Sequence, residues 1–63
     1  MIYNVVGDDK YGPFGVAERL GGLEYDNIES RTEADLICEI LNEGIGPEWD
    51  AVEPELERRI RTR

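Results

Sequence analysis

The sequence predicts an α+β fold, in which a three-stranded antiparallel meander packs on one helix and a second helix lies near the C-terminus. Three observations lead to this prediction: short runs rich in β-branched and aromatic residues, a Gly-Gly pair between two of them, and one segment with helical periodicity. The 63 residues allow a single domain. We divide it into a core over residues 1–45 and a C-terminal extension over residues 46–63.

The first strand is predicted over residues 2–6, because β-branched and aromatic side chains favour extended backbone. Residues 7–13 are rich in Gly, Asp and Pro, which predicts a loop. Residues 14–20 predict the second strand, since large apolar side chains alternate there with small or polar ones. An alternative for this segment is a short helix over residues 13–20, with proline in its first turn and Gly21 as its end.

The third strand is predicted over residues 23–28, joined to the second by a two-residue turn at Gly21-Gly22. Glycine accepts the positive φ angles that such hairpin turns require. This turn implies a register in which apolar residues face each other and opposite charges face each other: Leu20 with Leu23, and Arg19 with Glu24.

The clearest element of the sequence is a helix predicted over residues 32–43. Ser30 and Glu33 have the spacing of a capping box, in which the hydroxyl accepts the backbone N–H three residues later. Gly44 is suited to the left-handed backbone that ends many helices, and Ile45 is then placed near Ile40. At 100° per residue the polar side of this helix carries Asp35, Glu39, Asn42 and Glu43.

The apolar side of the same helix covers close to half of its circumference, which is wider than contact with one layer requires. Either a sheet covers it broadly, or part of it meets a second chain or the C-terminal segment. If a second chain is involved, Leu36 and Ile40 are the residues that we expect to mediate self-association, as a homodimer. The alternative is that the whole face belongs to the core of one chain.

The C-terminal helix is predicted from about residue 54, with Pro54 in its first turn. Glutamates lie toward its beginning and arginines toward its end, as the helix dipole favours. Trp49 and Val52, just before it, are expected to pack against the core.

Composition excludes several classes of chemistry. The chain has no His and one Cys, so it offers neither a Ser-His or Cys-His pair nor a zinc ligand set. Asp8-Asp9 lacks the further acids of a calcium loop, and no glycine-rich phosphate loop is present. We therefore expect a non-enzymatic protein without metal or cofactor. No signal peptide or membrane span is evident, so we expect a cytoplasmic protein without membrane contact.

Charge is the strongest functional signal. The net charge is −8, but all 15 acids lie in residues 1–57 with only three of the 7 bases, which makes that part −12 and the last six residues +4. Such a body attracts basic surfaces and repels nucleic acid. Carboxylates spaced along a helix also imitate a row of phosphates, which suggests mimicry of nucleic acid. The acids that we predict to contact a basic partner are Asp35, Glu39, Glu43, Glu48, Asp50 and Glu53, although they could equally form a solvated face.

Two further sites are considered. Tyr11 and Phe14 flank a Gly-Pro pair and would anchor a protein partner if exposed, whereas the alternative places Phe14 in the core. The four arginines of residues 58–63 could bind phosphates, which would make the protein a nucleic-acid binder. They could also pair with acids of the same chain or of a second copy.

Residues 1–45 resemble the small β-β-α accessory proteins of bacteriophages and other mobile genomes. The resemblance lies in the first strand, the Tyr-Gly-Pro-Phe-Gly-Val loop, the glycine hairpin, the Ser/Thr-x-x-Glu-Ala helix start and the Leu-Asn-Glu-Gly helix end. It implies a non-enzymatic protein that binds a host factor, as an inhibitor or adaptor, and no functional residues follow from it. The sequence thus predicts an acidic module that binds a basic surface of a host protein.

Overall fold

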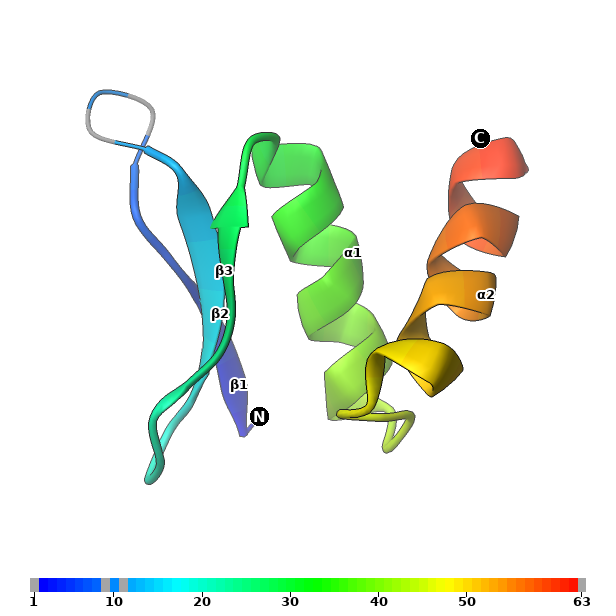
Figure 1. Cartoon of the computed structure of the whole chain (residues 1–63), viewed down its shortest axis with the longest axis horizontal. Coiled ribbons are helices and arrows are strands. Elements are labelled where there is room, and N and C mark those ends of the chain that lie inside the picture. Colours follow the sequence, from blue (N-terminus) through cyan, green and yellow to red (C-terminus); the bar gives the residue numbers. More distant parts are fainter. Residues whose placement is uncertain (1, 9, 11, 63) are drawn as a thin grey trace.

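The computed structural model describes residues 2–8, 10 and 12–62, and it confirms the α+β class. Its antiparallel sheet has the strand order β1-β2-β3. In Figure 1 the sheet, α1 and α2 lie side by side, with α1 in the middle and the two helices running in opposite directions. The elements are β1 (Tyr3–Val6), β2 (Phe14–Glu18), β3 (Leu23–Ile28), α1 (Arg31–Asn42) and α2 (Trp49–Arg61).

Helix α1 covers one face of the sheet. Phe14 and Val16 on β2 are 5% and 0% exposed, and their partners across the sheet also pack on the core: Val5 opposite Val16, Tyr25 opposite Val16, and Ile28 opposite Phe14. Alternate residues point to the other face, where Val6 and Leu23 remain exposed. The strand predicted for residues 14–20 is confirmed over its first five residues, and the alternative helix over residues 13–20 is wrong.

The predicted register between β2 and β3 is wrong. Leu23 pairs with Ala17, and the chain between Glu18 and Leu23 forms a longer loop in which the Glu18 N–H donates to the Gly22 carbonyl at 3.2 Å. Leu20 is 93% exposed in that loop. The predicted turn would have set Asn27 opposite the fully buried Val16. The observed register sets Tyr25 there instead, and β3 accommodates the change with an irregularity that includes Asn27 at a φ of 57°.

Helix α1 begins and ends close to the predicted bounds of 32–43. The Ser30 hydroxyl accepts the Glu33 N–H at 3.4 Å, as the capping box predicts. At the other end Gly44 has a φ of 93°, and the Ile45 N–H donates to the Ile40 carbonyl at 3.3 Å. This bond is the Schellman ending that the Gly44-Ile45 pair predicts.

Helix α2 begins at Trp49, five residues before the predicted start at Pro54. Pro54 therefore lies inside the helix, where its missing N–H leaves the Asp50 carbonyl without an intrahelical donor. Both residues are exposed, so water can satisfy that carbonyl. The earlier start places Val52 and Leu56, which are 0% and 4% exposed, one turn apart against α1.

The wide apolar side of α1 is explained by contacts on two sides, because α1 touches all three strands and also α2. Leu36 and Ile40 are 3% and 0% exposed. This corrects the expectation that these two residues could mediate self-association: the chain's own sheet and C-terminal helix cover them, so they offer no surface to a second copy. Of the alternatives drawn from the sequence, contact with the C-terminal segment is the one observed.

Asn42 ties the end of α1 to the open edge of β1. Its Oδ1 accepts the N–H groups of Ile2 and Tyr3 at 3.1 and 2.9 Å, and its Nδ2 donates to the Tyr3 carbonyl at 3.3 Å. The Cys38 thiol donates to the same carbonyl at 3.3 Å. The sequence placed Asn42 on the polar side of the helix, but its amide acts here as a substitute for a neighbouring strand.

We predict that Asn42→Ala lowers the free energy of unfolding by about 1–3 kcal/mol, because backbone groups of β1 lose their partners. Urea denaturation followed by circular dichroism measures the change. Asn4→Ala on the exposed face of β1 is the matched control and should change stability by less than about 0.5 kcal/mol. An equal loss in both variants would show that the Asn42 bonds contribute little.

The loop between the helices depends on a close approach at Gly46. A Cβ atom there would lie 2.7 Å from Val52 Cγ2 and 2.9 Å from Leu41 Cδ2, both in the core between the helices. Gly44 has nearly the same backbone, with a φ of 93° against 95°, but a Cβ there would meet nothing within 4 Å.

Gly46→Ala should therefore destabilise the protein more than Gly44→Ala. Both substitutions pay the left-handed backbone penalty of about 1–2 kcal/mol, and only Gly46→Ala adds overpacking of about 1–3 kcal/mol. Thermal and urea unfolding of the two variants measure the difference. Equal losses would contradict the close packing of this loop on Val52 and Leu41.

Candidate functional site

The predicted acidic contact residues fall into two exposed groups. Asp35, Glu39 and Glu43 follow each other at every fourth position along α1, and Glu48, Asp50 and Glu53 lie around the start of α2. Because side chains four apart lie on one face of a helix, the first group forms a row. These acids thus lie on or directly beside two helices, in two separate groups.

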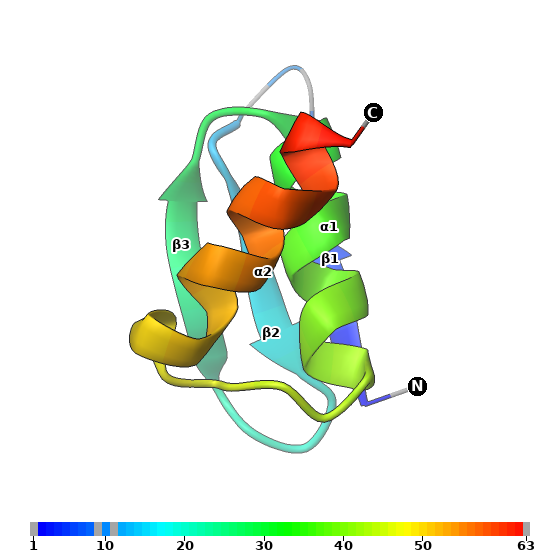
Figure 2. The ribbon, with the colours of Figure 1, turned by 90° about the vertical axis from the view of Figure 1, so that its right-hand side faces the viewer.

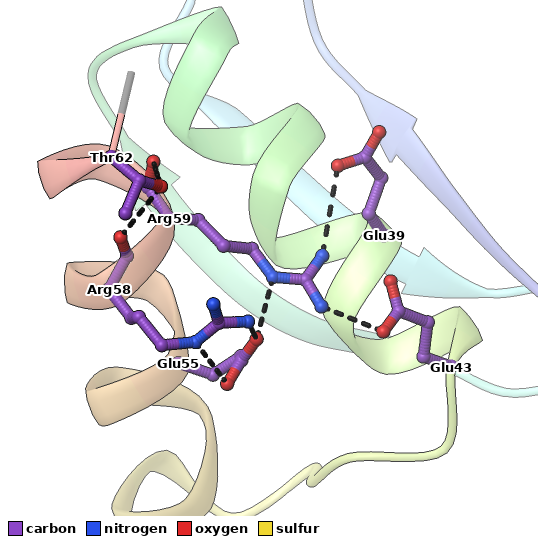
Figure 3. A network of polar contacts seen from close by, with 6 residues as sticks. All are labelled: Glu39, Glu43, Glu55, Arg58, Arg59 and Thr62. Carbon is purple, nitrogen blue, oxygen red and sulfur yellow. Dashed lines mark hydrogen bonds and ion pairs between the residues drawn. The ribbon is translucent and has the colours of Figure 1, made fainter.

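Part of the row on α1 is neutralised by Arg59, as Figure 3 shows. The Arg59 side chain is 18% exposed and lies between the helices. Its Nη2 contacts Glu43 Oε1 at 2.7 Å, its Nε donates to Glu55 Oε1 at 2.9 Å, and its Nη1 lies 3.9 Å from Glu39 Oε2. Arg58 pairs with Glu55 from the other side.

This cluster answers one alternative raised by the sequence: Arg58 and Arg59 pair with acids of their own chain. Arg61 is exposed and makes no ion pair with the described residues, and Arg63 lies outside them. Arg59 therefore connects α2 to α1, and Arg58 pairs with Glu55, which also contacts Arg59. Asp35, Glu48, Asp50 and Glu53 keep carboxylates that no described side chain neutralises.

The two arginines shift the acidity of their partners. Hydrogen bonds from Arg58 and then Arg59 lower the pKa of Glu55 from 4.5 to about 2. A hydrogen bond from Arg59 also lowers the pKa of Glu43. In turn the pKa of Arg59 is raised, first by Glu43 and then by Glu55. The Glu55 carboxylate thus stays charged well below its ordinary pKa.

The aromatic site predicted in the first loop is not observed. Phe14 is 5% exposed and belongs to the core, as the alternative reading of the sequence had it, so it cannot anchor a partner. Tyr11 lies outside the described residues. In the same loop the Asp8 carboxylate accepts the Lys10 N–H at 2.9 Å. Among the described residues no group of three potential ligands could hold a metal ion.

Cys38 offers little nucleophilic chemistry. It is half-buried on α1, and burial, followed by the charge of Asp35, raises the pKa of its thiol. Asn42 Nδ2 contacts the sulfur at 3.5 Å. A thiol that stays protonated and donates to a backbone carbonyl acts as a packed side chain.

The structure also forms a groove that the sequence did not predict, where Trp49 meets Tyr25. The two ring centroids are 5.7 Å apart with the planes at 58°, and the Tyr25 hydroxyl donates to the Pro47 carbonyl. The sequence suggested that Trp49 packs against the core, but this residue is 43% exposed. A sequence signal for this groove would have required predicting that α2 begins at Trp49 and not at Pro54. Among the residues that line the groove are Asp26, Asn27, Ile28, Glu29, Glu33 and Ile37.

Comparison of the chain with protein-family models, with curated proteins and with solved structures gives no match. None of the described helices has the length and apolar character needed to cross a membrane. The function must therefore be argued from the charges and surfaces of this chain.

The Glu55 cluster predicts how stability depends on pH. A lowered carboxyl pKa stabilises the fold fully above the ordinary value of 4.5, and this stabilisation is lost as the pH falls toward about 2. We expect Glu55→Gln to be less stable than the native protein at neutral pH and to lose less stability on acidification through this window. Urea unfolding at several pH values measures both.

Glu57→Gln is the matched control for this experiment, since Glu57 is an exposed acid of the same helix without an ion pair to the described residues. It should keep the native pH dependence. An unchanged acid slope in Glu55→Gln would contradict the role of the arginine contacts.

Proposed function

We propose that the protein is a small acidic, non-enzymatic module that binds a basic surface of another protein in the cytoplasm, as an inhibitor or adaptor of the kind found in bacteriophages. The observation that carries the proposal is the excess of exposed carboxylates that the fold leaves unneutralised. Glu39, Glu43 and Glu55 form ion pairs, whereas Asp35, Glu48, Asp50 and Glu53 form none with the residues that the structure describes.

This charge distribution acts on encounter as well as on the bound state. A surface of one sign attracts a partner of the opposite sign before contact and raises the association rate, and it repels partners of the same sign. Among these acids Asp35 lies on α1, Asp50 and Glu53 lie on α2, and Glu48 directly precedes α2, so the helices set the spacing of their backbone positions. A basic face that normally binds phosphates would meet several unpaired negative charges on this surface.

The alternative of nucleic-acid binding through residues 58–63 is less favoured. Arg58 and Arg59 are held by Glu55, Glu43 and Glu39, and the surrounding surface is strongly negative. Phosphate binding would have to break these pairs and overcome repulsion from the acids. Homodimerisation through Leu36 and Ile40 would require α2 or the sheet to move away.

The proposal predicts binding to basic proteins that weakens as salt is added. Immobilised protein is tested by interferometry against purified nucleic-acid-binding domains with basic faces, with acidic proteins of similar size as controls. Neutralising Asp35, Glu48, Asp50 and Glu53 together, with Asn or Gln, should weaken binding roughly tenfold or more.

Arg61→Gln is the control variant, since it removes an exposed charge of the opposite sign and should leave binding as strong or stronger. Absence of binding to every basic domain, or binding that is indifferent to salt, would overturn the proposed function. A shift of labelled DNA by the native protein, lost in Arg61→Gln, would favour the nucleic-acid alternative instead.

A further inference from the structure

The groove beside Trp49 combines three segments that are distant in the sequence. Tyr25 and Ile28 come from β3, Glu33 and Ile37 from α1, and Trp49 from the first turn of α2. In Figure 2 α2 lies nearest the viewer, with β3 to its left and α1 to its right. The groove has a volume of about 500 Å³, within the range of sites that hold small ligands or side chains.

The aromatic part of the groove is held in place and partly open to solvent. The Tyr25 hydroxyl donates to the Pro47 carbonyl, which fixes its ring, and the tilted contact with Trp49 positions the indole. Trp49 remains 43% exposed. The face of an aromatic ring attracts cations, and tryptophan attracts them most strongly.

The rest of the lining is mainly polar and acidic. Ile28 and Ile37 also line the groove, but at 8% and 1% exposed they leave little apolar surface open to a ligand. Asp26, Glu29 and Glu33 line the same groove, and none of their carboxylates forms an ion pair within the described part of the chain. No described lysine or arginine lines it.

The local field is negative as well. The pKa of Tyr25 is raised, first by burial and then by the charges of Glu24 and Glu48. Arg58 and Arg59 do not supply positive charge here, because they lie near the opposite end of α2 and contact glutamates there. The groove is therefore complementary to a cation with an apolar stem that comes from another molecule.

We propose that this groove binds an arginine side chain from an exposed basic segment of a partner protein, with the guanidinium between Trp49 and the carboxylates. The inference rests on the proposed function and locates its central contact. Arginine fits better than lysine, because its flat guanidinium stacks on aromatic rings and pairs with carboxylates through two parallel hydrogen bonds. Its methylene groups would lie against the exposed part of the Trp49 side chain.

The test uses a blocked arginine-rich peptide, its lysine counterpart and its citrulline counterpart, which keeps the shape but lacks the charge. Trp49 is the sole tryptophan of the chain, so its fluorescence reports directly on the groove. The arginine peptide should change the emission, with the lysine peptide binding more weakly. The citrulline peptide should bind roughly tenfold or more weakly.

Two variants locate the contact, with affinities measured by calorimetry and folding checked by circular dichroism. Trp49→Leu should weaken the arginine peptide about two- to fivefold through the lost ring contact. Glu33→Gln, which keeps the backbone bond to Ser30, should weaken it by a similar factor. Glu57→Gln removes the same charge outside the groove and should bind nearly as the native protein does.

The outcomes separate this inference from the proposed function. If the arginine peptide binds the native protein and both groove variants equally, but loses affinity when Asp35, Glu48, Asp50 and Glu53 are neutralised, the groove assignment is overturned and the proposed function stands. Equal binding of the lysine peptide would overturn the assignment to arginine. If neither the peptides nor any basic domain binds, the proposed function fails and the inference fails with it.

Discussion

Burial of α1 from two sides is the interaction on which the rest of this structure depends. A chain of 63 residues has a small core, and here one helix contributes half of the buried apolar residues: Ala34, Leu36, Ile37, Ile40 and Leu41. The sheet covers one side of this helix, and Val52 and Leu56 of α2 cover the other. Without α2 the side of α1 that faces away from the sheet would be exposed to water. The C-terminal segment is therefore an integral part of the core.

The position of α2 decides which charges remain at the surface. Its contact with α1 brings Arg59 within reach of Glu43 and Glu39, and Glu55 of the same helix completes the cluster. Two positive charges of the C-terminal segment, those of Arg58 and Arg59, are thereby neutralised by acids of the same chain. The acids around the start of α2 and in the groove form no ion pair with the described residues. In the sequence the acids and the C-terminal arginines are separate, but in the folded protein some of them pair. The unpaired charge that remains on the surface is mainly negative.

The same contact creates the groove. Because α2 begins at Trp49, its indole reaches Tyr25 of β3, and Asp26, Glu29 and Glu33 line the same groove. The packing of α2 on α1 thus accounts for the second half of the core, for the neutralised arginines and for the groove lined by aromatic and acidic residues. The proposed binding of a basic partner would use the unpaired acids and the groove.

The sequence by itself determined the elements whose signals are local. The capping serine, the Gly44 ending and the β-branched runs each act within a few residues, so the order of three strands and two helices and the bounds of α1 could be predicted. Tertiary structure alone decided the register of β3, the start of α2, the inward turn of Asn42 and the meeting of Trp49 with Tyr25. The physical reason is that each of these depends on which distant apolar surface must be covered. Tyr25 lies opposite the buried Val16, and Val52 lies in a helix that covers the far side of α1 although Pro54 follows in the same helix. Neither arrangement can be predicted from a local sequence pattern.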